Sequence, residues 1–373
     1  MTDDATAFVR LHLFACEAAR SYTQDDSPRT RLTVDLADIR AWRFFKAAPE
    51  AFFEQYASDY VIENVHLEPR CAEAALEWLA EHPVSDLALS GRLLREKTQS
   101  LVERGRTLDV GVAVHELTAP RLLTLVKSEG TLVLHASSAA PQWAQALLGA
   151  GAPASAAAHS YWAQIVRGLL TQEVLPDLRI RDKNQFFGYL KALAARTAQG
   201  LNWAAIGEEC GASAPSVRQW TQYLHAARWI TLVPAVRAAA PRRAKLRPKL
   251  YWTHPGLALW LTDASSNPAP EFVTRLYENA LFLALKTALP TAAFGHFLDT
   301  NNVYAPLIIE QGAHRQAVYP LTCDADRDEA LRCLKSLARG GIVEPAARSV
   351  TQPADPRTDA PFARLSLISS TKD

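Results

Sequence analysis

The sequence predicts a mixed α/β protein of several domains, on three observations. The chain has 373 residues, a length that accommodates two or three domains. Hydrophobic residues make up 49% of it and nine tryptophans are available for buried cores, which excludes wholesale disorder. Short apolar runs typical of strands, at residues 7–14 and 31–36, precede longer runs with the spacing of amphipathic helices.

The N-terminal domain is expected to span residues 1–130 and to begin with those two strands. The segment between them contains neither glycine nor lysine, since the first lysine of the chain is Lys46 and the first glycine is Gly91. A phosphate-binding loop needs glycines so that backbone N–H groups can surround the phosphates, and a lysine for the terminal charges. Asp25 and Asp26 would instead repel phosphate. We therefore expect no conventional nucleotide site here, and a divergent site is the alternative.

A helical connector is expected over residues 131–181. Its run of glycine and alanine at 149–158 is typical of a hinge, because no Lys-Ser or Lys-Thr follows it as in a phosphate loop. The next predicted helix, at residues 160–173, has one apolar face formed by Trp162, Ile165, Val166 and Leu169.

Residues 182–263 contain three predicted helices. The first covers 184–197, and the second covers 203–209 and ends at Cys210-Gly211, where glycine suits a helix stop. Ser213 can cap the third helix, which runs to about residue 227 and buries Val217, Trp220 and Leu224. Its polar residues then point outward, namely Ser216, Arg218, Gln219 and Gln222. Such side chains hydrogen-bond base edges in a major groove, and an ordinary helical hairpin with a polar face is the alternative.

A basic run follows the third helix. After the extended residues 229–236 come six cations with no carboxylate among them, namely Arg237, Arg242, Arg243, Lys245, Arg247 and Lys249. Because the net charge of the whole chain is only +1, this excess is a local patch. Pro241 and Pro248 discourage helix, and residues 250–252 return as strand, which gives a hairpin that can lie along phosphates. The pattern predicts a winged helix-turn-helix with DNA as partner, and a solvated loop is the alternative for the hairpin.

The stretch from FFGYLKALAARTAQGL to RPKLYWTHPGLALWL resembles the winged-helix region of a large prokaryotic family of AAA-type ATPases. In that family a P-loop domain comes first, and a nuclease-like domain of unknown function, of the 4143 type, follows the winged helix. The family's lysine-leucine-tyrosine-aromatic pattern, followed shortly by glycine-leucine, is met at residues 249–257, with His254 in place of the usual aspartate. The resemblance covers about residues 7–345 and implies the same order of domains.

Upstream, RLTVDLADIR to VIENVHLEP is similar to the family's stretch that ends at the Walker B strand. Glu63 stands where an aspartate would hold magnesium, and Asn64 stands where a glutamate would polarise the attacking water. An amide has no useful basicity, so Asn64 cannot act as a general base. Residues 87–91 resemble the sensor strand. Gly105-Arg106 resembles a pair that points at a neighbour's nucleotide, so that Arg106 is a candidate trans-acting arginine. The resemblance thus implies an ATPase fold without its chemistry.

Residues 264–349 correspond to the nuclease-like domain, and residues 350–373 form a tail rich in Pro, Asp and Ser, part of which is expected to be disordered. Restriction-type sites need an aspartate on one strand and glutamate-x-lysine on the next. The resemblance places Pro306 at the aspartate position, and Tyr319 and Leu321 at the glutamate and lysine positions. Glu278 matches a family glutamate, but with Glu310 alone it makes no metal site. For both glutamates we expect salt-bridged surface roles.

Other kinds of site have little support. The five cysteines form no CxxC pair and the ten histidines include no HExxH or HxH, so a disulfide scaffold, a zinc knuckle and a zinc hydrolase are not expected. His115-Glu116 is interpreted as structural. The acidic Asp3-Asp4 lacks the positive region of a signal peptide, and no run approaches the roughly 20 apolar residues of a membrane span. We expect a protein of the bacterial cytoplasm, away from membranes and without metal or cofactor.

The function predicted from the sequence is that of a catalytically inactive AAA-type ATPase homologue. It would bind DNA through its winged helix and act as a scaffold or regulatory subunit. One alternative is a functional ATPase subunit whose site is divergent or is shared with an active paralogue, on whose nucleotide Arg106 would act. Another is a protein-docking module that does not bind DNA.

Overall fold

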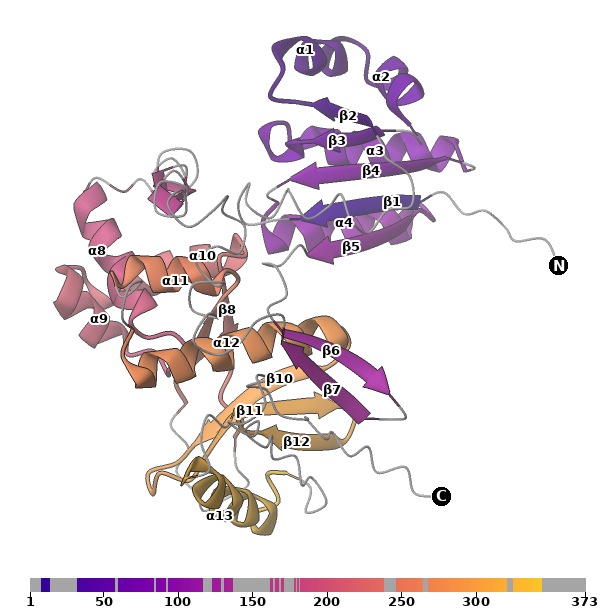
Figure 1. Ribbon diagram of the computed structural model, residues 1–373. Coiled ribbons are helices and arrows are strands. Elements are labelled where there is room, and N and C mark those ends of the chain that lie inside the picture. Colours follow the sequence, from indigo (N-terminus) through magenta and orange to yellow (C-terminus); the bar gives the residue numbers. More distant parts are fainter. Residues whose placement is uncertain are drawn as a thin grey trace. The chain divides into compact units, whose positions relative to one another are not determined.

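The protein is mixed α/β, as the sequence predicts (Figure 1). The computed structural model describes residues 8–13, 32–57, 60–83, 85–91, 93–116, 123–128, 131–136, 182–237, 246–263, 268–320 and 325–343, with short pieces between 162 and 180. There are two compact units. The first comprises Met1–Thr118 with Gln222–Trp229, and the second comprises Ala119–Thr221 with Ile230–Asp373. None of the described helices is long and apolar enough to cross a membrane.

The first unit is built on a five-stranded sheet in the order β2-β3-β4-β1-β5, in which every neighbouring pair is parallel. The strands are β1 (Phe8–Leu13), β2 (Leu32–Asp35), β3 (Tyr60–Glu63), β4 (Asp86–Gly91) and β5 (Gly111–Glu116). Between β1 and β2, which follow each other in sequence, lie β4 and β3 in the sheet. Between β4 and β5 lies β1. The connection from β1 therefore leads to one edge of the sheet and the connection from β4 leads to the other. Open parallel sheets bind their ligands at the carboxyl ends of such a pair of strands.

Among the described residues, four helices and one short 3-10 helix pack on this sheet. They are α1 (Ile39–Ala47), α2 (Pro49–Tyr56), η2 (Val65–Leu67), α3 (Arg70–Glu81) and α4 (Arg95–Thr107). The carboxylate of Asp38 begins α1 by accepting a hydrogen bond from the N–H of Arg40. Pro49 stands in the first turn of α2, where its missing N–H leaves no helical bond unmade.

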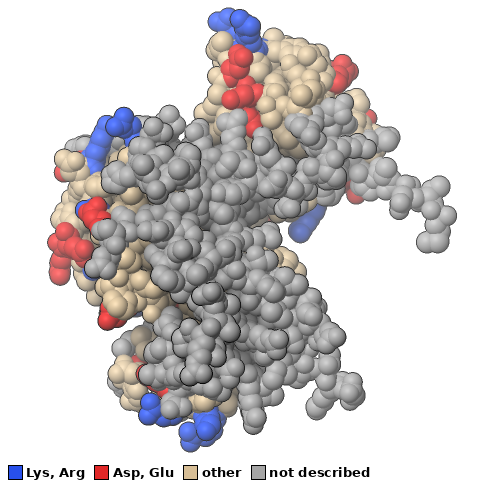
Figure 2. All heavy atoms as spheres, viewed as in Figure 1, with Lys and Arg blue, Asp and Glu red and all other residues tan. Residues whose placement is uncertain are grey.

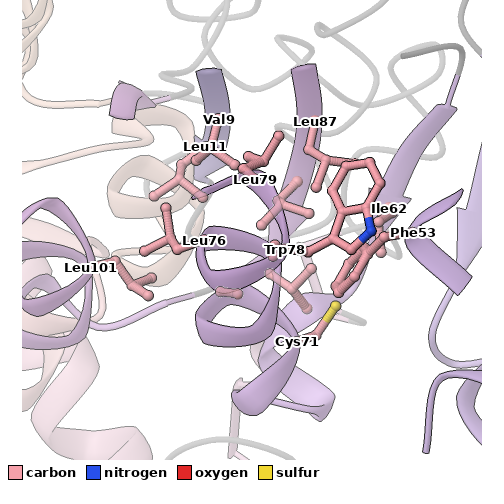
Figure 3. Close-up of a cluster of buried hydrophobic side chains, with 14 of the residues drawn as sticks. Val9, Leu11, Phe53, Ile62, Cys71, Leu76, Trp78, Leu79, Leu87 and Leu101 are labelled. Carbon is pink, nitrogen blue, oxygen red and sulfur yellow. The ribbon is translucent and has the colours of Figure 1, made fainter. Parts of the chain in front are cut away.

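The core of the first unit lies between the sheet and α3. Figure 3 shows leucines of α3 against the side chains of β1, and Trp78 against Phe53 and Ile62. The Phe53 and Trp78 rings have centroids 5.9 Å apart. This core uses apolar positions at helical spacing on α3, which is why the helix lies flat on the strands.

Helix α4 approaches β5 at Gly105. A Cβ at this position would lie 2.4 Å from Cγ2 of Val112 and 2.9 Å from the carbonyl oxygen of Val110. The absence of a side chain is therefore what allows α4 to pack on β5 at this point.

The first unit also includes the end of helix α10 (Ala214–Ala226) and the turn after it. Arg228 is buried there with a φ of 65°. Its guanidinium donates hydrogen bonds to the Thr98 hydroxyl (2.9 Å) and to the Leu93 carbonyl. Arg95 in turn donates to the carbonyl of His225 (3.1 Å). These bonds explain why Gln222–Trp229 belongs with the N-terminal residues.

The second unit begins with an antiparallel hairpin, β6 (Leu123–Ser128) and β7 (Thr131–Ala136), which the sequence did not predict. Of the apolar face expected for the helix at 160–173, Trp162, Val166 and Leu169 are buried and Ile165 is half-buried. Further elements follow in the order α8 (Lys183–Ala194), α9 (Trp203–Cys210), α10, β8 (Ile230–Val233), β9 (Lys249–Trp252) and α11 (Pro255–Leu261).

The C-terminal part of the second unit is a small antiparallel sheet with a helix on each side (Figure 1). Its elements are α12 (Pro270–Ala288), β10 (Ala293–Leu298), β11 (Tyr304–Gln311), β12 (His314–Val318) and α13 (Ala325–Arg339). Leu334 and Leu337 of α13 share a buried cluster with Ile308 of the central strand. On α12, Phe282 contacts Phe294 with ring centroids 5.4 Å apart.

Candidate nucleic-acid interface

Helices α8, α9 and α10 occupy the positions that the sequence predicts. Asp182 begins α8, where its carboxylate accepts hydrogen bonds from the N–H groups of Asn184 (2.9 Å) and Gln185 (3.1 Å). Helix α9 ends at Gly211, whose φ of 71° is the left-handed conformation expected there. The hydroxyl of Ser213 accepts a hydrogen bond from the N–H of Ser216 (3.2 Å), which caps the start of α10.

Helix α10 buries the stripe predicted for it. Val217 and Leu224 are fully buried and Trp220 is 7% exposed. The Trp220 ring packs edge-on against Phe186 and Tyr189 of α8, with centroids 5.3 and 5.2 Å away. This contact orients α10 on α8 and leaves the opposite face outside.

The opposite face of α10 is polar and exposed. Arg218, Gln219 and Gln222 are all exposed. Ser216 is half-buried, and its hydroxyl lies 2.8 Å from that of Ser213, so it takes part in the cap. Three of the four side chains predicted to meet base edges are thus available on one surface of the helix.

Strands β8 and β9 form the predicted hairpin. They are antiparallel, with Ile230 opposite Trp252 and Val233 opposite Lys249. The segment between α8 and α9 lies on the other edge of β9, where the N–H of Ala198 donates to the carbonyl of Leu250 (2.7 Å). Strand β9 therefore lies between β8 and residues 198–201, and the hairpin continues directly from the helical part.

Exposed cations lie at both described ends of the basic segment, which we define as residues 237–247. Arg237 follows β8 and Arg247 precedes β9, and both are exposed. Arg242, Arg243 and Lys245 lie outside the described residues. On the face of the molecule in Figure 2, described cations and carboxylates are mixed.

Lys249 does not belong with these exposed cations. It is 8% exposed, and its ammonium nitrogen lies 2.5 Å from a carboxylate oxygen of Glu278. The Tyr251 hydroxyl donates to the same oxygen (2.5 Å), and burial, reinforced by the negative charge of Glu278, raises the pKa of Tyr251. An ammonium buried in an ion pair cannot reach a phosphate, so the assignment of Lys249 to DNA contact is corrected.

Comparison with known proteins adds one match in this region. The family described as Domain of unknown function (DUF8612) matches residues 143–268. The match includes α8 to α11 with the hairpin and covers less than half of the chain. No curated protein and no solved structure matches the chain.

The residues that resemble a Walker B site lie at the carboxyl end of β3. Glu63 and Asn64 are both 8% exposed. Asn64 has a φ of 59°, and its amide nitrogen donates to a carboxylate oxygen of Asp35 at the end of β2 (2.7 Å). Ser90, at the end of β4, is also buried. Arg106 lies on the last turn of α4 and is exposed.

Three of the residues that resemble a nuclease site are buried, namely Glu278, Pro306 and Tyr319. Glu278 is salt-bridged as expected, but it is buried and not on the surface. Glu310 pairs with Arg315 at 2.8 Å and is partly exposed. Pro306 lies within β11, and the buried Tyr319 donates its hydroxyl hydrogen to the carbonyl of Tyr304 (2.6 Å). Leu321 lies outside the described residues.

Proposed function

We propose that this protein binds DNA through α10 and the basic segment, and that it is a catalytically inactive AAA-type ATPase homologue with a scaffold or regulatory role. The observation that carries the proposal is the exposed polar face of α10, which is followed in the chain by a hairpin whose ends carry Arg237 and Arg247. A helix of this kind can enter a major groove while cations along a hairpin contact phosphates.

The side chains on α10 suit base recognition. An arginine donates two parallel hydrogen bonds to guanine, and a glutamine amide can donate to and accept from adenine. Arg218, Gln219 and Gln222 supply both kinds of group. Their exposure, together with the buried Trp220 that fixes the helix, supports a recognition role.

The inactive ATPase part of the proposal is supported by the first unit. Its parallel sheet has the diverging connections that suit a ligand crevice, but the segment between β1 and β2 contains no glycine and no lysine. Asn64 supplies an amide where a base is needed, and that amide donates to Asp35. A protein of this composition can retain the fold while it serves as a scaffold.

A role beside an active paralogue is favoured by one observation. Arg106 is exposed on the last turn of α4. An arginine so placed can reach the nucleotide of a neighbouring subunit, where its charge would stabilise the transferring phosphoryl group. The test compares ATP turnover by the paralogue in the presence of the wild type and of Arg106→Ala. Equal turnover in both cases would exclude this role.

Titration of DNA binding against salt tests the DNA proposal. If the basic segment makes three or four phosphate contacts, the log of affinity falls against log salt with a slope near −3, at roughly 0.9 per phosphate. Replacing Arg242, Arg243, Lys245 and Arg247 by alanine should flatten this slope and weaken all sequences alike. A control with equal charge loss replaces four exposed cations elsewhere by alanine, namely Arg40, Arg43, Lys335 and Arg339. Absence of binding at low salt would overturn the DNA proposal and leave protein docking as the alternative.

Sequence preference tests the helix separately. Arg218→Ala or Gln219→Ala should change the ranking of DNA sequences, because each lost base contact costs about 1–3 kcal/mol at its own position only. Binding-site selection from a random pool measures this ranking. An unchanged ranking in both variants would remove α10 from the interface.

A further inference from the structure

His296 of β10 is hydrogen-bonded to residues just before the basic segment and to the last residue of that segment. Its backbone carbonyl accepts a hydrogen bond from the N–H of Val236 (2.8 Å), and its N–H donates to the carbonyl of Pro234 (3.1 Å). Its ring Nε2 lies 2.9 Å from the carbonyl oxygen of Arg247. Because a carbonyl only accepts, Nε2 carries the hydrogen and donates it. One residue therefore joins the strand that enters the segment to the strand that leaves it.

His296 lies opposite a β-bulge. The pairing of β10 with β11 shifts register between Gly295 and Phe297. Pro306 and Leu307 of β11 together stand opposite the single residue His296, and a proline has no N–H to give to a ladder. On its other edge the backbone of His296 pairs with residues 234–236, which form a parallel bridge to it.

A carbonyl within the bulge is hydrogen-bonded to side chains of β9. The carbonyl oxygen of Pro306 accepts hydrogen bonds from the ammonium of Lys249 (3.1 Å) and from the hydroxyl of Tyr251 (3.3 Å). Glu278 completes the cluster, since its carboxylate contacts both of these groups. All the charges in this cluster are buried and satisfied.

This buried ion pair fixes the register of β9. A buried pair is weak evidence for stability, but breaking it leaves an uncompensated charge. A slip of β9 by one residue would bring Leu250 to Glu278 and turn Lys249 away, because successive side chains of a strand point to opposite faces. The pair thus keeps Lys249 inside, whereas Arg247, which precedes β9, is exposed.

We propose that residues 270–319 form an anchoring platform for the basic segment, with His296 as its positioning residue. Cations whose attachment points are fixed lose less conformational freedom when they bind phosphate. The platform would therefore raise the affinity for DNA without contacting DNA. The nucleic-acid part of this inference rests on the proposed function, whereas the anchoring is a property of the protein alone.

Hydrogen exchange without DNA tests the anchoring in the full chain. In His296→Ala, amides in peptides covering residues 230–237 and 246–252 should exchange about tenfold faster than in the wild type, because both attachment points loosen. His296→Gln keeps an N–H donor and should restore protection. His254→Ala is the matched control, since His254 is another buried histidine of the same unit, and it should leave these two peptides unchanged. Equal exchange in His296→Ala and wild type, or equal acceleration in His254→Ala, would overturn the anchoring.

DNA titration tests the consequence. His296→Ala should weaken binding about tenfold for every sequence at an unchanged salt slope, because the number of cations is unchanged. A flattened slope, or an undiminished affinity, would overturn the positioning role. If the wild type binds no DNA while the exchange results hold, the proposed function fails and the anchoring stands.

A second variant covers the case in which His296→Ala does not fold. The double change Lys249→Met with Glu278→Met removes the ion pair without leaving a buried charge. It should accelerate exchange at residues 246–252 and lower the affinity in the same manner. Unchanged exchange there would overturn the platform.

Discussion

Two histidines of the second unit are held in their neutral form. His254 is 2% exposed, and burial lowers its pKa from 6.5 to about 4. For His296, burial and then the positive charge of Lys249 lower the pKa to about 4 as well. Each histidine therefore binds a proton more readily in the unfolded chain than in the folded one.

The consequence is a loss of stability in acid. Between pH 6.5 and 4 the unfolded state carries the extra protons, so the free energy of unfolding should fall as the pH drops through this range. The expected slope is about 1.4 kcal/mol per pH unit for each histidine. Urea unfolding at pH 7 and pH 5 measures it, with the double variant His254→Gln and His296→Gln as comparison. Equal pH dependence in the variant and the wild type would contradict this expectation.

Residues whose partners are distant in sequence could not be assigned from local patterns. Lys249 begins an apolar strand, and the basic run before it predicted exposure, but its partner Glu278 is supplied by α12. His296 gave no signal, since a histidine in a strand is uninformative until the bulge at Pro306 is known. The capping residue Ser213 was predicted because a cap bonds within three residues of itself.

At the level of elements, helical glycines fall into two classes. A Cβ at Gly207 of α9 would lie 2.3 Å from the carbonyl oxygen of Ala212, as close as the contact at Gly105 of α4. At Gly188 of α8 the nearest atom would be Cβ of Cys210, at an ordinary 3.8 Å. The first two glycines are required by packing, and the third is not.

Alanine substitutions should separate these classes. Gly105→Ala and Gly207→Ala should destabilise by about 1–3 kcal/mol, because the added methyl forces backbone to move. Gly188→Ala should stabilise by about 0.5–1 kcal/mol, since alanine loses less conformational entropy in a helix. Chemical denaturation of the three variants measures the differences. A stabilised Gly105→Ala would show that α4 and β5 can separate without cost.

Helices with a strong periodicity of apolar residues were predictable, whereas strands defined by their pairing with other strands were not. The three helices α8 to α10 occupy their predicted positions because apolar spacing, caps and a stop glycine agree. The hairpin of β6 and β7 was missed, and its residues were divided between a domain and a connector. Contacts between residues far apart in the chain also place Gln222–Trp229 in the first unit. No periodicity in the sequence indicates this assignment.

For the whole molecule we expect very weak nucleotide binding. Without a glycine nest and a lysine between β1 and β2, the phosphates lack most of their charge-assisted hydrogen bonds. The isolated protein should bind ATP no more tightly than about 1 mM and should not hydrolyse it. Calorimetry and a phosphate-release assay measure both properties, with Glu63→Ala as the control. Micromolar affinity, or magnesium-dependent turnover lost in Glu63→Ala, would establish a divergent site.

The contact made by Gly105 has a consequence for classification. Its missing side chain is demanded by Val110 and Val112, so helix packing alone is enough to account for this glycine, whether or not the protein binds a nucleotide. A sequence profile that scores the glycine-arginine pair would gather proteins that share the architecture, whether or not they hydrolyse ATP. If the proposed homology holds, the positions that would distinguish an active homologue are those between residues 14 and 31, where this chain has no glycine.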